Sequence, residues 1–198
     1  HPVLYDIDFT IARGQTLGLI GESGSGKSTL GRVLSGLVPA ARGTALIDGR
    51  DLDLRDAKRR RAQDRRDLQI VFQMADTALN PRQSITEILG RPLSFYHGMR
   101  GKARTARVHE LLDMVRLPRH LASAGPRELS GGQKQRVNLA RALAAEPKLV
   151  ICDEVTSALD TVVANAVVEL LVDLQRDLGL SYLFISHDLG KVEAMCNE

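Results

Sequence analysis

Short apolar runs alternate with longer helical patterns along most of the chain. The runs have the length and composition of strands buried in a sheet, and polar or glycine-containing segments separate them. They cover residues 16–20, 44–47, 68–72, 148–152 and 182–185. Strands that alternate with helices predict an α/β fold with a largely parallel sheet, flanked by helices on both faces.

The first residues follow a strict alternation instead. Tyr5, Ile7 and Phe9 fall on one face of the segment Val3–Thr10, which predicts a strand. Asp48-Gly49 predicts a turn at the end of the short strand before it. We therefore expect an antiparallel β portion near the N-terminus, beside the parallel sheet.

Residues 74–128 have a different character. Prolines interrupt this segment, and helical patterns lie between them, one of which covers 102–116. The apolar side chains of that pattern recur with the spacing of one helix face: Val108, Leu111, Leu112 and Val115. We expect 74–128 to be an α-helical subdomain inserted into a core formed by 1–73 and 129–198.

Composition narrows the class of protein. The chain has 198 residues, 43% of them hydrophobic, which is enough to bury a core. No apolar stretch reaches the ~18 residues of a membrane span. Cys152 and Cys196 lack the spacing of a disulfide framework or a metal site, and Cys152 lies in an apolar run that predicts a buried thiol. The chain begins at His1, and we expect it to be a piece of a longer polypeptide.

The charge distribution gives no case for a nucleic-acid partner. The formal net charge is only +3, and the basic residues concentrate in 55–66. This cluster is typical either of an anion-binding surface or of a solvated helix. Interspersed acids such as Asp56 and Asp64, and the lack of aromatic residues for base stacking, favour the solvated helix.

A phosphate-binding pattern follows the strand at 16–20. Its sequence is Gly-Glu-Ser-Gly-Ser-Gly-Lys-Ser, which fills G-x-x-x-x-G-K-[ST] between a predicted strand and a predicted helix. A glycine-rich turn with a surface lysine is the alternative, and the strand and helix around the pattern argue against it. Backbone N–H groups and the positive helix end would surround the phosphates of ATP. Lys27 would reach the β- and γ-phosphates, and the Ser28 hydroxyl would ligate Mg²⁺. The predicted nucleotide-binding residues here are Gly21, Glu22, Ser23, Gly24, Ser25, Gly26, Lys27, Ser28 and Thr29.

Two acids follow the apolar strand at 148–152. Asp153 would lie at the carboxyl edge of the sheet, where it can meet the Mg²⁺ held by Ser28. Glu154 could polarise a water molecule as a general base for attack on the γ-phosphate. The alternative is an acidic N-cap for the next helix.

A second anion-binding helix end is predicted at Leu129–Gln133. Ser130 is a good N-cap, and Gly131 and Gly132 would expose backbone N–H groups. Plain capping would not need two glycines, since glycine weakens a helix by about 1 kcal/mol relative to alanine.

Taken together, these motifs resemble the nucleotide-binding domain of an ABC transporter over nearly the whole chain. The resemblance implies a P-loop NTPase core and extends the site with further residues. The signature motif of the family is matched by Ser130, Gly131, Gly132 and Gln133. The D-loop of the family is matched by Ser157-Ala158-Leu159-Asp160, which implies that Asp160 lies at the nucleotide. Gln73 resembles the Q-loop glutamine that touches Mg²⁺, and His187 the switch histidine that contacts the γ-phosphate.

The same resemblance implies a mechanism and partners. Two such domains meet head to tail, and each ATP lies between the phosphate loop of one and the signature of the other. Closure drives transmembrane permease subunits at the cytoplasmic face of the inner membrane, and a solute-binding protein takes part indirectly. The expected catalytic residues are Glu154, His187 and Gln73, and the expected metal ligands are Ser28, Gln73 and Asp153.

A finer resemblance points to the ATP-binding subunits of peptide and nickel importers. Leu79-Asn80-Pro81-Arg82 and the segment 183–189 carry it. The chain departs from the family pattern at Met74-Ala75, where an acid–proline pair is usual, and at Val155, where proline is usual.

Three other functions fit parts of the pattern. A DNA-repair or chromosome ATPase would need long coiled coils, and 74–128 is too short and too interrupted by proline. A soluble translation factor with two such domains is disfavoured by the transporter-like stretch after Gln73. A regulator that only binds ATP is disfavoured by Glu154.

Overall fold

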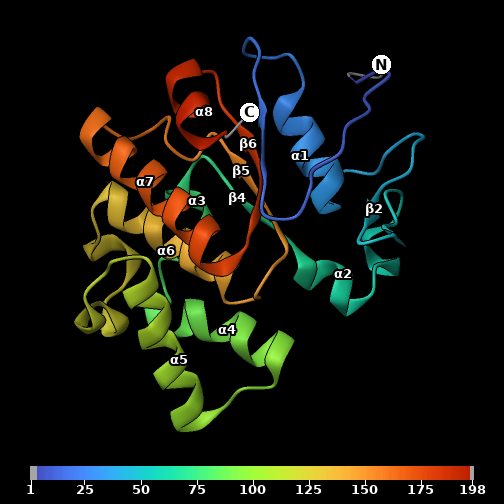
Figure 1. Cartoon of the computed structure of the whole chain (residues 1–198). Helices are drawn as coiled ribbons and strands as arrows, with labels where there is room; N and C mark the ends of the chain where they lie inside the picture. Colours follow the sequence, from blue (N-terminus) through green and yellow to red (C-terminus); the bar gives the residue numbers. More distant parts are fainter. Residues whose placement is uncertain (1–3, 197–198) are drawn as a thin grey trace.

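A parallel sheet forms the centre of the molecule. The computed structural model describes residues 4–196, and within them the sheet has four strands (Figure 1). They are β1 (Thr16–Leu19), β4 (Leu68–Val71), β5 (Leu149–Asp153) and β6 (Ser181–Ile185), in the order β1-β6-β5-β4. All neighbouring pairs run parallel, as the alternating pattern predicts.

The register of these strands brings the candidate residues to one edge. Leu19 and Asp153 both pair with Ile185, and Val71 pairs with Cys152. The carboxyl ends of all four strands therefore lie level with one another. In open α/β sheets, ligands bind outside this edge.

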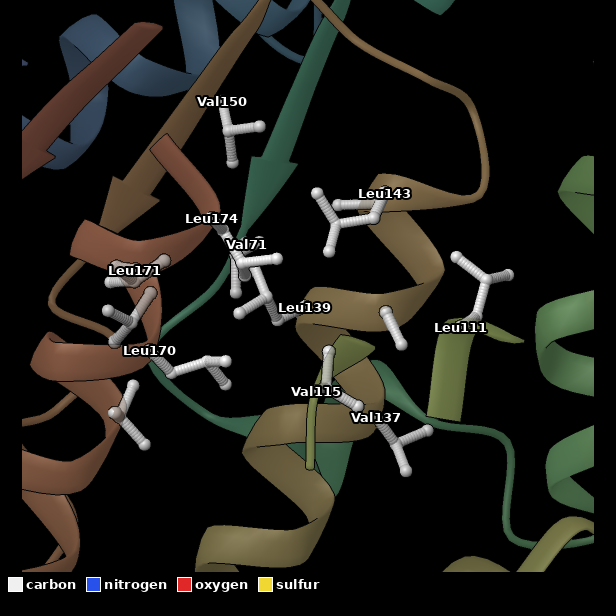
Figure 2. Close-up of a cluster of buried hydrophobic side chains, with 14 of the residues drawn as sticks. Val71, Leu111, Val115, Val137, Leu139, Leu143, Val150, Leu170, Leu171 and Leu174 are labelled. Carbon is white, nitrogen blue, oxygen red and sulfur yellow. The ribbon is translucent and has the colours of Figure 1, made fainter. Parts of the chain in front are cut away.

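Helices cover both faces of the sheet. The side chains of β5 and β6 alternate between two buried clusters, with Ile151 in one and Cys152 in the other. On one face, α1 (Lys27–Ser35) approaches closely through Gly31, where a Cβ would lie 3.3 Å from the Ile151 side chain. On the other face, α6 (Gly131–Leu143) and α7 (Thr161–Leu178) pack their leucines and valines against β4 and β5 (Figure 2). The last helix, α8 (Leu189–Met195), contacts α7 and β1.

The segment after β4 is helical, as its sequence predicts. It contains α3 (Ala75–Ala78), α4 (Ile85–His97), α5 (Gly101–Met114), and the 3₁₀ helices η2 (Arg119–Ser123) and η3 (Pro126–Glu128). The predicted apolar stripe of α5 is buried, and it belongs to the same hydrophobic cluster as the leucines of α6 and α7. The helix ends at Met114, one residue before the last apolar position, Val115.

The predicted antiparallel portion near the N-terminus is present, but residues 4–10 take no part in it. It is a hairpin of β2 (Leu46–Ile47) and β3 (Arg50–Asp51), closed by Asp48 and Gly49, which both have positive φ. The strand predicted at Val3–Thr10 is wrong for residues 4–10, and Val3 lies outside the described residues. Tyr5, Ile7 and Phe9 are exposed. None of the described strands pairs with this segment. An alternating sequence without a neighbouring strand has no backbone hydrogen bonds to hold it extended.

The basic segment is only partly the solvated helix predicted for it. It forms η1 (Ala57–Arg59) and α2 (Ala62–Asp67), and Arg60 between them is 3% exposed. The Arg60 guanidinium donates hydrogen bonds to the carbonyl oxygens of Val33, Leu34 and Asp53, so it binds the end of α1. Charge patterning does not show which arginine of a cluster is buried in this way.

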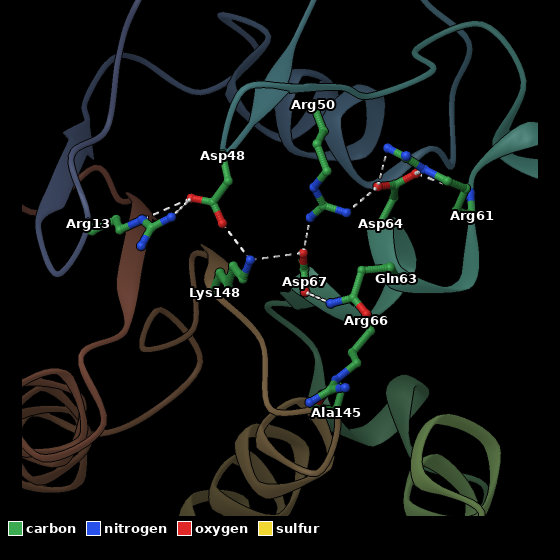
Figure 3. Close-up of polar contacts among 10 residues, drawn as sticks. All are labelled: Arg13, Asp48, Arg50, Arg61, Gln63, Asp64, Arg66, Asp67, Ala145 and Lys148. Atoms are coloured by element: carbon green, nitrogen blue, oxygen red, sulfur yellow. Dashed lines mark hydrogen bonds and ion pairs between the residues drawn. The ribbon is translucent and has the colours of Figure 1, made fainter.

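A network of ion pairs connects this segment and the hairpin to the sheet (Figure 3). Lys148, which precedes β5, pairs with Asp48 of the hairpin turn and with Asp67 of α2. Arg50 of β3 pairs with Asp67 and Asp64. The network lies where β4 and β5 begin, at the opposite end of these strands from the candidate site.

Within residues 4–196, no helix has the length and apolar character needed to cross a membrane.

Candidate active site

The phosphate-binding pattern forms the loop between β1 and α1. Gly24 and Gly26 have φ of 84° and 97°, a conformation that side chains other than glycine rarely adopt. Lys27 is 8% exposed, and its Nζ donates to the carbonyl oxygens of Gly21 and Glu22 at 2.7 Å each and to Ser25 Oγ at 3.3 Å. The lysine is therefore held inside the loop, and the alternative of a surface lysine is wrong.

The other residues of the loop lie around this lysine. Glu22, Ser23, Gly24 and Ser25 are exposed, and Ser28 and Thr29 are half-buried in the first turn of α1. The loop therefore presents its backbone to solvent at the N-terminal end of a nine-residue helix. Such an end carries partial positive charge, which suits a phosphate group.

Two of the three predicted metal ligands, Ser28 and Asp153, lie in contact. Ser28 Oγ donates to Asp153 Oδ1 at 2.8 Å. Burial raises the pKa of the Asp153 carboxyl, and the Ser28 hydrogen bond acts in the opposite direction. A hydroxyl and a carboxylate are oxygen donors, which magnesium prefers, so this pair fits the ion that the pattern implies.

Glu154 turns away from the strand that carries Asp153. Its φ is +49°, and its backbone N–H donates to the Ile185 carbonyl oxygen at 3.0 Å. Its Oε1 lies 3.4 Å from Nδ1 of His187, which follows β6. Asp160, rather than Glu154, caps α7, since its Oδ1 accepts from the Val163 N–H at 3.0 Å. The alternative of a capping role for Glu154 is therefore wrong.

Gln73 lies beyond the end of β4, and its side chain contacts the segment that follows Glu154. Its Nε2 donates to Ser157 Oγ at 2.9 Å. The sequence places Ser157 in the D-loop but gives it no role. Only the adjacency of β4 and β5 brings the two residues together.

The signature residues cap α6. Ser130 Oγ accepts from the Gln133 N–H at 3.3 Å, and Gln133 Oε1 accepts from the Ser130 N–H at 2.9 Å. Gly131 is exposed, whereas a Cβ at Gly132 would overlap the Val163 side chain of α7. Packing against α7 therefore requires the second glycine, and anion binding is not needed to explain it.

The structure brings only some of the predicted residues together. Lys27, Ser28, Asp153, Glu154 and His187 share the carboxyl edge of the sheet. Among residues 4–196, no hydrogen bond joins the phosphate loop to the segment 130–133 or to Asp160. Instead, Gly131 lies against the side chain of Leu159, in the segment before α7. The chain thus carries two separate groups of candidate residues.

A small groove separates Gln73 from the signature helix. Its volume is about 90 Å³. Its lining comes from the segment after β4, from α6 and from the segment before α7: Gln73, Met74, Ala75, Asp76, Gly131, Lys134, Gln135, Ala158 and Leu159. Met74, where the chain departs from the pattern of the importers, is exposed there.

A family of known proteins matches the part of the chain that carries the phosphate loop and the two acids after β5. The family described as ABC transporter matches residues 4–157, and the chain therefore belongs to this family. The oligopeptide transport ATP-binding protein OppF of Lactococcus lactis is 42% identical over 96% of this chain and 59% of its own length. The glutathione import ATP-binding protein GsiA of Escherichia coli is 46% identical over 94% of this chain and 30% of its own length. The chain spans about half the length of the first curated relatives it matches.

Solved structures confirm the fold class. The ATP-binding cassette MJ0796, in a dimeric post-hydrolysis state bound to ADP and Pi, superposes with a TM-score of 0.85 at 33% identity, over 98% of this chain and 83% of that chain. The protein cbiO1 of Clostridium perfringens, part of the ABC transporter complex cbiONQ, gives a TM-score of 0.85 at 30% identity, over 98% of this chain and 76% of that chain.

Proposed function

We propose that this chain binds ATP with Mg²⁺ and hydrolyses it as the ATP-binding part of a peptide importer. The observation that carries the proposal is the grouping of Lys27, Ser28, Asp153, Glu154 and His187 at the carboxyl edge of the sheet. Relatives named for oligopeptide transport and glutathione import support the class of solute.

Each group at that edge has a role in this proposal. The loop 21–26, Lys27 and Thr29 hold the phosphates, and Ser28, Asp153 and Gln73 supply oxygen ligands for the metal. When bound, Mg²⁺ neutralises charge on the phosphates. Glu154 accepts a proton from the attacking water. His187, whose Nδ1 lies 3.4 Å from Glu154 Oε1, contacts the γ-phosphate beside that carboxylate.

The remaining residues would serve a second copy or a related domain. We infer that Ser130, Gly131, Gly132, Gln133 and Asp160 meet the nucleotide of a partner domain in a head-to-tail dimer. Their separation from the phosphate loop within one chain supports this inference. The relative MJ0796 is a dimer in its post-hydrolysis state.

The chain would act at a membrane through other subunits. We propose that 1–73 and 129–198 form the ATP-binding core, that 74–128 forms the α-helical subdomain, and that transmembrane permease subunits dock at the cytoplasmic face of the inner membrane. A solute-binding protein would take part indirectly. The relative cbiO1 is part of an ABC transporter complex. This likeness supports a permease partner for the present chain over a role as a soluble ATPase.

Lys27→Ala tests the proposed nucleotide site. The substitution removes the ammonium group that would bind the phosphates, so we expect a loss of ATP affinity of about 10-fold or more, as for charge-assisted hydrogen bonds. Titration with a fluorescent ATP analogue measures it. Lys102→Ala, at an exposed position on α5, is the matched control. Thermal unfolding of both variants shows whether the fold is kept, and wild-type affinity in a folded Lys27→Ala chain would contradict the assignment.

A further inference from the structure

Ser157 connects Gln73 to the segment that carries Glu154. Gln73 Nε2 donates to Ser157 Oγ at 2.9 Å, and Ser157 Oγ in turn donates to the Glu154 carbonyl oxygen at 2.9 Å. The backbone N–H of Ser157 donates to the same carbonyl oxygen at 3.1 Å. The serine hydroxyl therefore lies between the Gln73 side chain and the turn that follows Glu154.

The chemistry of these contacts fixes the orientation of the Gln73 amide. A serine hydroxyl has one proton to donate. Because that proton goes to the Glu154 carbonyl oxygen, Ser157 Oγ can only accept a hydrogen bond from Gln73. An amide oxygen turned toward Ser157 would meet a lone pair with no proton between them. The contact thus holds Nε2 of Gln73 toward Ser157 and turns Oε1 away from it.

The amide oxygen is the atom of Gln73 that can ligate a hard cation. We propose that Ser157 is a positioning residue, which orients the Gln73 amide so that Oε1 is presented to the magnesium ion of a bound nucleotide. This inference rests on the proposed function, which assigns Gln73 to the metal. Gln73 is exposed, so without Ser157 its amide would be free to rotate. Ordering it in advance lowers the entropy cost of binding.

The contact is tested first in the protein without nucleotide. In a chain labelled with ¹⁵N-glutamine, the Gln73 side-chain amide signals are identified by their loss in Gln73→Ala. We expect these signals to shift in Ser157→Ala and to stay near their wild-type positions in Ser157→Thr, which keeps the hydroxyl.

The control for this measurement is Ser123→Ala. The Ser123 hydroxyl also donates to a carbonyl oxygen three residues earlier, that of His120, but it accepts from no glutamine in the part of the chain that the structure describes. We expect the Gln73 signals to be unchanged in this variant. Gln73 signals that are also unchanged in Ser157→Ala would overturn the proposal.

The second test measures ATP affinity with magnesium and with a chelator in its place. Loss of one hydrogen bond predicts that Ser157→Ala weakens binding about 2- to 10-fold with magnesium. Without magnesium we expect no change, and Ser157→Thr should match the wild type in both conditions. Since Ser157 acts through Gln73, the substitution should have no further effect in a Gln73→Ala chain.

The outcomes separate this inference from the function on which it rests. Equal losses with and without magnesium, or an undiminished loss in the Gln73→Ala chain, would overturn the positioning role of Ser157. A wild-type chain whose ATP binding does not depend on magnesium would contradict the proposed function and the magnesium part of the inference. The amide signals would still decide whether Ser157 orients Gln73.

Discussion

At the scale of single residues, the two acids after β5 have opposite surroundings. Asp153 is buried and bonded to Ser28, whereas Glu154 is partly exposed and faces His187. The left-handed backbone conformation of Glu154 separates them, since it turns the second side chain off the line of the strand. In the proposed function these adjacent carboxylates have different tasks, Asp153 at the metal and Glu154 at the attacking water.

Glu154→Gln should separate binding from hydrolysis. The amide is close in size to the carboxylate but cannot accept the proton of the attacking water. We expect ATP binding to be kept and hydrolysis to slow by about 10²- to 10⁴-fold, the usual share of general base catalysis. Phosphate release measures turnover, and Glu169→Gln, at an exposed position on α7, is the control. Unchanged turnover would remove Glu154 from the role of base.

At the scale of elements, the ion-pair network of Figure 3 joins the hairpin β2–β3 to the helix α2. Asp64 is buried and accepts from the Arg61 backbone N–H, from two nitrogens of the Arg61 side chain and from Arg50. The hydrogen bonds from the Arg61 side chain hold the pKa of the Asp64 carboxyl below its ordinary value. The ionised carboxylate is therefore the form that stabilises the folded chain.

This predicts a pH-dependent effect of Asp64→Asn. A lowered pKa in the folded state contributes stability above the unfolded value, about pH 4, and this stability is lost as the pH falls through the folded value. We expect Asp64→Asn to cost on the order of 1–2 kcal/mol at neutral pH and less in acid.

Urea unfolding at neutral and at acidic pH measures the difference in the free energy of unfolding between Asp64→Asn and the wild type. Asp177→Asn is the control, because the pair between Asp177 and Arg176 is exposed and such pairs contribute little. A cost for Asp64→Asn that does not vary with pH would show that packing, not charge, explains it.

At the scale of the whole molecule, the two groups of candidate residues point to an assembly. The phosphate loop and the signature each end at a helix N-terminus, but no hydrogen bond joins them in the described chain. Gly132 packs on Val163, so the signature helix, the Asp160 cap and α7 form one packed unit. We infer that this unit faces a nucleotide held by another domain.

The assembly should form when ATP is bound but not hydrolysed. We expect Glu154→Gln to be monomeric alone and to form a dimer with MgATP, because slow hydrolysis preserves the nucleotides at the interface. Light scattering coupled to gel filtration measures the mass in solution. The double variant Lys27→Ala/Glu154→Gln should stay monomeric. A Glu154→Gln chain that binds ATP and stays monomeric would exclude a dimer of two copies of this chain.

Sequence motifs and hydrophobic periodicity predicted the parts of the site that lie at the end of a single strand. The loop that leads into Lys27 connects β1 to α1, and the pair Asp153-Glu154 stands where β5 ends, so periodicity and motif located them. The contact between Gln73 and Ser157 depends on which strands are neighbours, and periodicity carries no such information. The same limit explains why the predicted strand is wrong over residues 4–10, where alternation gives a tendency but no pairing strand.

The three partners of Lys27 have a consequence for calorimetry. An ammonium group has three N–H donors, and Gly21, Glu22 and Ser25 already engage them in this loop. A phosphate that binds Lys27 must displace some of these acceptors, so association exchanges hydrogen bonds and does not simply add them. The heat of nucleotide binding is then a difference between two sets of charged hydrogen bonds. A small binding enthalpy would mean that loop and nucleotide compete for the same protons, not that the lysine is uninvolved.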